Sequence, residues 1–116
     1  MIQKLYFNLV NSINGLKVAC KEHSFVIEIL GGIILLPYLI VLELNTLFKL
    51  LIMSTYFLLL AFEIINTSIE KLCDKITKEI DSDIKKIKDL ASASVFVVLI
   101  ALIVLIIFTF FPSFLE

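Results

Sequence analysis

Residues 91–111 read ASASVFVVLIALIVLIIFTFF and contain no charged side chain over 21 consecutive positions. A helix needs about 20 predominantly apolar residues to cross the hydrocarbon core of a bilayer, so this stretch predicts a transmembrane span. Two further apolar runs, residues 25–42 and 47–65, predict two more spans. The composition agrees, because 60% of the 116 residues are apolar and the mean hydropathy is +1.08, whereas soluble domains contain about 45–50% apolar residues. The sequence therefore predicts an all-α membrane protein.

The N-terminal residues 2–21 predict an amphipathic helix that lies on the membrane surface. Apolar side chains recur there at helical spacing, and Lys4, Asn8 and Lys17 stand between them. Such a helix is too polar to span a bilayer. With residues 66–90 as a segment outside the membrane, the chain from 1 to 116 is expected to form a single integral membrane domain.

The lysines predict which way the chain crosses the membrane. Lys4, Lys17 and Lys21 precede the first span and six lysines lie between the second and third, whereas the turn between the first two spans has only Lys49. Lysine-rich flanks favour the cytoplasmic side. The N-terminus and residues 66–90 are therefore expected in the cytoplasm, where ATP is found.

A polar stripe of four residues, Glu63, Asn66, Glu70 and Asp74, follows the second span. At about 100° per residue, these side chains fall within roughly 80° of one another on a helix. Ionisable groups at the mouth of a membrane helix are costly to keep there and favour a functional site. The polar stripe therefore predicts chemistry at the membrane surface.

The number and spacing of the glycines exclude the glycine-rich loops that bind phosphate in many nucleotide-binding enzymes. The chain has three glycines and neither a Walker nor a Rossmann pattern. It also has no arginine, so a bound nucleotide triphosphate would need Mg²⁺ held by carboxylates, with lysine as a point charge. Candidates for the carboxylates and the lysine lie near the predicted cytoplasmic surface: Glu22, Glu70 and Lys88. We expect no nucleic acid among the partners.

Glu63 is the acid of the polar stripe that lies deepest in the apolar run. A carboxylate there can accept a proton from a lipid hydroxyl at the interface, and Asn66 can hold either group. Asp74, like Glu79 and the nearby lysines, fits a solvated helix end equally well. Glu28 either contacts the lipid substrate or extends to the membrane surface.

The polar stripe is also the start of a longer motif. The spacing Glu63-x-x-Asn66-Thr67-x-Ile69-Glu70-x-x-x-Asp74 is followed 14 residues later by Lys88-Asp89, and then by Ser92-Ala93-x-Val95. This motif resembles that of the prokaryotic diacylglycerol kinase family in residue type, spacing and position relative to the spans. The surface helix, the three spans and the length also fit, so the resemblance covers nearly the whole chain.

The resemblance implies a lipid kinase of the bacterial inner membrane, usually a homotrimer with active sites shared between subunits. Such an enzyme transfers the γ-phosphoryl of MgATP to the hydroxyl of diacylglycerol and gives phosphatidic acid. The matching positions imply the following roles: Glu63 as catalytic base; Glu22 and Glu70 as ligands of the metal and, through it, the nucleotide; Lys4, Glu79, Asp81, Lys88 and Asp89 as nucleotide contacts; and Ser92 on the lipid side. The chain departs from the family pattern after Phe25. Members of the family commonly have an arginine shortly after this phenylalanine, whereas Phe25 is followed here by Val26.

A related branch of the family phosphorylates undecaprenol with the same catalytic residues. The Asp74-Lys-Ile-Thr segment and the Ala-Ser-Ala-Ser-Val run resemble the diacylglycerol branch more closely.

A non-enzymatic alternative is a small transporter or pore subunit whose acids, Glu28 and Glu63, bind protons or cations. The acids cluster at one end of the spans instead of the bilayer centre, which disfavours this alternative.

Overall fold

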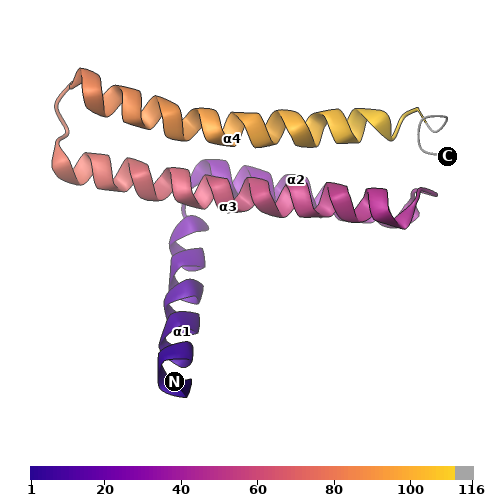
Figure 1. Cartoon of the computed structure of the whole chain (residues 1–116), viewed down its shortest axis with the longest axis horizontal. Helices are drawn as coiled ribbons and strands as arrows, with labels where there is room; N and C mark the ends of the chain where they lie inside the picture. The colour runs from indigo at the N-terminus through magenta and orange to yellow at the C-terminus, as the bar shows by residue number, and fades with distance from the viewer. Residues whose placement is uncertain (112–116) are drawn as a thin grey trace.

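The computed structural model describes residues 1–111, which form four helices and no strand. These are α1 (Ile2–Ala19), α2 (His23–Val41), α3 (Thr46–Ile76) and α4 (Ser82–Phe108). Figure 1 shows α3 and α4 side by side and antiparallel, with α2 behind α3 and α1 extending away from this bundle. The predicted all-α fold is confirmed for the described residues.

Helices α2, α3 and α4 are each long and apolar enough to cross a membrane, which confirms the three predicted spans. Helix α3 has 31 residues and is therefore about 46 Å long, more than the roughly 30 Å of a hydrocarbon core. Its polar C-terminal part extends beyond the apolar part. Most of residues 66–90 are helical, because they form the end of α3 and the start of α4. We call this end of the bundle the polar end.

Both turns between the spans end in a helix cap. The Asn45 side chain accepts a hydrogen bond from the Leu47 amide at 2.8 Å and so caps α3. Asp81 Oδ1 accepts from the amides of Asp83 and Ile84 at 2.9 and 3.0 Å and caps α4. Each cap satisfies amides that have no partner inside the helix.

Helix α4 ends three residues before the predicted end of the third span at Phe111. The Thr109 hydroxyl donates to the carbonyl of Ile106, and the Thr109 amide bonds to the same carbonyl at 3.0 Å. Threonine side chains compete in this way with the helical hydrogen-bond ladder. The helix therefore stops at Phe108, although the sequence stays apolar.

Apolar side chains pack the half of the bundle that lies away from the polar end, and we call it the packed half. Its buried residues come from all three spanning helices: Leu35, Leu39, Ile52, Tyr56, Leu59 and Leu102. Tyr56 crosses α2 at Gly32, where a Cβ would overlap the tyrosine ring, and its hydroxyl donates to the Glu28 carbonyl at 2.9 Å. Gly32 therefore allows α2 and α3 to approach closely.

Helix α1 lies apart from the packed half. Most of its apolar side chains are exposed, including Leu5, Leu9 and Leu16. The placement of α1 on a membrane surface stays a prediction. The turn after α1, residues 20–22, carries the chain into α2 and brings Glu22 to the bundle.

Candidate active site

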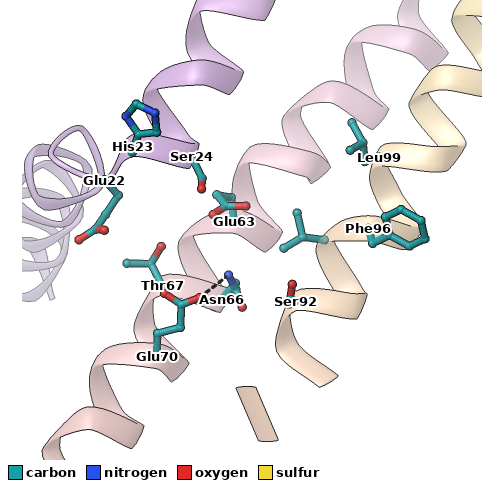
Figure 2. Close-up of a pocket in the computed structure, with 11 residues that line it drawn as sticks. Glu22, His23, Ser24, Glu63, Asn66, Thr67, Glu70, Ser92, Phe96 and Leu99 are labelled. Atoms are coloured by element: carbon teal, nitrogen blue, oxygen red, sulfur yellow. Dashed lines mark hydrogen bonds between the residues drawn. The ribbon is translucent and has the colours of Figure 1, made fainter. Parts of the chain in front are cut away.

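A cavity of about 380 Å³ lies between α2, α3 and α4 where the packed half meets the polar end. Figure 2 shows its lining side chains converging from the three helices. We call it the polar cavity. Its lining consists of Glu22, His23, Ser24, Glu63, Asn66, Thr67, Glu70, Ser92, Val95, Phe96 and Leu99.

Helix α3 supplies the polar wall of this cavity. Glu63, Asn66 and Glu70 share one helix face because residues three and four apart are neighbours on a helix. Glu63 and Asn66 are buried, at 6% and 7% exposure, whereas Glu70 is exposed at the mouth. The Asn66 Nδ2 donates to Glu70 Oε1 at 3.2 Å (Figure 2). Asn66 Oδ1 is buried without a hydrogen-bond partner, so it is an acceptor that a ligand can use.

The α1–α2 turn supplies the opposite wall. The amides of Lys21 and Glu22 donate to carbonyls in the last turn of α1 at 3.1 and 2.9 Å, which makes the turn tight. Glu22 stands at the N-cap position of α2 and is half-buried. Its Oε1 lies 3.1 Å from the Lys71 Nζ of α3. This ion pair joins the turn to α3.

Helix α4 supplies Ser92, and Lys88 lies one turn before it on the same face. Lys88 does not line the polar cavity; its Nζ donates to Asp74 Oδ1 at 2.6 Å. Because this ammonium hydrogen-bonds to the carboxylate, it lowers the pKa of Asp74, which lies beyond the apolar part of α3. Asp89 pairs with Lys85 at 2.7 Å on the exposed side of α4.

Glu28 borders a second cavity of about 490 Å³, which lies next to the first between the same three helices. Apart from Glu28 and two tyrosines, its lining is apolar, and we call it the apolar cavity. Glu28 Oε2 is buried without a hydrogen-bond partner. The carboxyl lies close enough to Glu63 for the two groups to interact. The Glu28 carboxyl therefore lies inside the bundle, and its contact with a lipid substrate stays a prediction.

Three other predicted residues lie away from the polar cavity. Asp81 caps α4, Glu79 is exposed in the α3–α4 turn, and Lys4 is exposed on α1. The structure therefore brings together Glu22, Glu63, Asn66, Glu70 and Ser92. The nucleotide roles of Lys4, Glu79, Asp81, Lys88 and Asp89 stay predictions.

Several lining residues were not predicted from the sequence. Thr67 is buried beside Asn66, and Ser24 and His23 line the cavity from the first turn of α2 (Figure 2). Thr67 and His23 each follow a predicted residue directly and Ser24 lies two positions after Glu22, and that proximity in sequence was the available signal.

The oxygen atoms of the polar cavity suit a hard cation. In the described part of the chain, no three His, Cys, Asp or Glu side chains form a ready-made metal cluster. Mg²⁺ usually binds through one or two carboxylates, with water and substrate phosphates as its other ligands. Glu22 and Glu70 border the same cavity as the unpaired Asn66 Oδ1. The donor set fits a metal that is shared with a nucleotide.

A family model described as prokaryotic diacylglycerol kinase matches residues 10–110. The chain belongs to this family. A comparison with curated proteins gave no match. Family membership identifies a membrane lipid kinase, and it bears out the resemblance seen in the sequence. Membership of a kinase family supports an enzyme over the alternative of a small transporter or pore subunit.

Proposed function

We propose that this lipid kinase transfers the γ-phosphoryl of ATP to the hydroxyl of diacylglycerol and forms phosphatidic acid. The observation that carries the proposal is the position of Glu63. Its buried carboxyl lies where the apolar part of α3 ends, in a cavity that also contains Asn66, Glu70 and Glu22. A lipid hydroxyl and a nucleotide can meet at such a boundary.

Glu63 acts in this proposal as the general base. The lipid hydroxyl oxygen attacks the γ-phosphorus, the bond from that phosphorus to the bridging oxygen of ADP breaks, and ADP leaves. The hydroxyl proton passes to the Glu63 carboxylate. The burial of Glu63, at 6% exposure, limits access of bulk water and so disfavours hydrolysis of ATP. Asn66 orients the reacting groups through its unpaired Oδ1.

Glu22 and Glu70 hold the metal of MgATP in this proposal, with Lys88 and Asp89 as nucleotide contacts. When bound, Mg²⁺ neutralises charge on the phosphates. Lys88 is close enough to Glu70 for their charges to interact, which supports its place beside the nucleotide. Ser92 lines the cavity from α4 on the lipid side.

Active sites shared within a homotrimer are part of the proposal. Helix α1 extends away from the bundle, so Lys4 lies away from the polar cavity of its own chain (Figure 1). A neighbouring subunit can use such a residue, as it can Glu79 and Asp81 at the α3–α4 turn. We further propose the bacterial inner membrane as the location, with the N-terminus and the polar end in the cytoplasm, following the lysine distribution.

A phosphate-transfer assay with two acceptors tests the proposed function. The purified protein in lipid nanodiscs receives labelled ATP and either diacylglycerol or undecaprenol at equal mole fraction. We expect labelled phosphatidic acid as the dominant product, and no product when EDTA replaces Mg²⁺. Faster labelling of undecaprenol would change the acceptor. Labelling of neither lipid would refute the proposal.

A further inference from the structure

Lys71 places a positive charge directly against Glu22, a proposed metal ligand that lines the polar cavity. Its Nζ lies 3.1 Å from Glu22 Oε1. Lys71 follows Glu70 in α3, whereas Glu22 stands in the turn between α1 and α2. One ammonium group therefore pairs with one of the two carboxylates that are proposed to hold Mg²⁺.

We propose that Lys71 makes the site select magnesium that arrives with ATP over free magnesium. This inference rests on the proposed function, in which Glu22 and Glu70 hold the metal of MgATP. It concerns a residue that the motif does not include and that the sequence pattern assigned to a solvated helix face.

The charges decide the direction of this selection. Free Mg²⁺ that approaches Glu22 meets a carboxylate already paired with an ammonium, and it is repelled by that ammonium. MgATP carries a net negative charge, so its phosphates attract the same lysine. Lys71 therefore opposes the metal alone and favours the complex.

The exposure of the Lys71 and Glu22 side chains limits the expected change in metal affinity. The side chains of Lys71 and Glu22 are 56% and 36% exposed, so solvent screens their interaction. We expect changes of roughly threefold to tenfold in metal affinity, as is reasonable for partly screened charges.

Other lysines at the polar end are placed differently. Within residues 1–111, Lys71 is the lysine in ion-pair distance of Glu22, whereas Lys88 is paired with Asp74. Lys75 lies one turn after Lys71 on the same helix and is exposed. A Lys75 variant therefore controls for a general loss of positive charge at this end of α3.

The test measures binding of Mn²⁺, an EPR-active probe, to the full-length protein in nanodiscs without lipid substrate. Wild type, K71Q, K71R and K75Q are titrated with and without a non-hydrolysable ATP analogue. We expect K71Q to bind free Mn²⁺ about threefold to tenfold more tightly than wild type, and the metal–nucleotide complex more weakly. K71R retains the charge and should behave as wild type, as should K75Q.

Equal affinity of K71Q and K75Q for free Mn²⁺ would overturn the inference, and so would a failure of every variant to bind Mn²⁺. Thermal unfolding of K71Q and the result for K71R show whether a change reflects loss of the charge or loss of the fold. The outcome is separate from that of the lipid assay. A Lys71 effect on metal binding without phosphate transfer would refute the proposed function alone, and phosphate transfer with equal metal affinities would refute this inference alone.

Discussion

The polar cavity and the apolar cavity lie side by side between the same three helices, yet their walls have opposite chemistry. Both include Leu99 of α4, and the change from one to the other takes a single turn of α3. Leu59 lines the apolar cavity, and Glu63, four residues later, lines the polar one. A lipid kinase needs both environments, because its acceptor is apolar and its donor is highly charged.

The packed half and the boundary between the two cavities differ in how their polar atoms are satisfied. In the packed half, the Tyr56 hydroxyl bonds to the Glu28 carbonyl, and the Tyr38 hydroxyl lies 2.8 Å from Thr109 Oγ1. At the boundary, Asn66 Oδ1 and Glu28 Oε2 are buried without partners. Buried polar atoms without partners cost about 1–3 kcal/mol each. The comparison teaches that the packed half pairs its polar atoms and stabilises the bundle, whereas the boundary contains buried polar atoms that have no partner within the described chain.

The substitution E63Q tests the functional side of this comparison and has the largest expected effect. It keeps the size of the side chain and removes its capacity to accept a proton, so phosphate transfer to lipid should fall by roughly 10²–10⁴-fold. Thermal unfolding in detergent should stay close to wild type. The matched control is E43Q in the exposed α2–α3 turn, which should keep full activity. Full activity of E63Q would exclude Glu63 as the base.

The substitution G32A tests the packed half. An added Cβ overlaps the ring of Tyr56, so the ring must move and its hydrogen bond to the Glu28 carbonyl is lost. Overpacking of this kind costs about 1–3 kcal/mol. The adjacent G31A is the matched control, because a Cβ at Gly31 has no neighbouring atom within 4 Å. Thermal unfolding in detergent should show a lower midpoint for G32A than for G31A; equal midpoints would contradict close packing at Gly32.

The substitution D74N tests the polar end and has the smallest expected effect. Without the carboxylate, Lys88 loses the partner that positions it, and the KM for ATP should rise about twofold to fivefold, as is typical for an exposed ion pair. D83N, at an exposed position in the first turn of α4, serves as the control.

The pH dependence sharpens this third prediction. The pKa of Asp74 is lowered in the folded protein, so the ion pair is present above the ordinary aspartate pKa and is lost as the pH falls through the lowered value. The ratio of the KM of D74N to that of wild type should therefore be constant between about pH 5.5 and pH 8. A ratio that falls within this range would show that the pair does not position Lys88.

Periodicity and length were sufficient to predict much of this molecule. An apolar run of about 20 residues has few stable structures other than a membrane helix, because its backbone must form its hydrogen bonds internally. The spacing from Glu63 to Glu70 likewise placed three polar groups on one face, since helical geometry fixes which residues are neighbours. These parts of the fold and of the site follow from local rules, and the structure contains both.

Contacts between helices are set by packing, which local rules do not determine. The sequence did not show that Ser24 and His23 would line the cavity, that Lys71 would pair with Glu22, or that Asp81 would cap α4. Nor did the sequence show that Lys88 would pair with Asp74; its contact with a nucleotide stays a prediction. The turn at residues 20–22 and the close approach of α2 and α3 at Gly32 decide these contacts.

The sequence by itself thus determined the three apolar helices, the polar stripe and the family to which both belong. Only the tertiary structure decided that Glu22, from the α1–α2 turn, and Ser92, from α4, border the same cavity as that stripe. The physical reason is that the helical repeat fixes the neighbours of a residue within one helix. Its neighbours on other helices depend on the turns and on how the side chains pack.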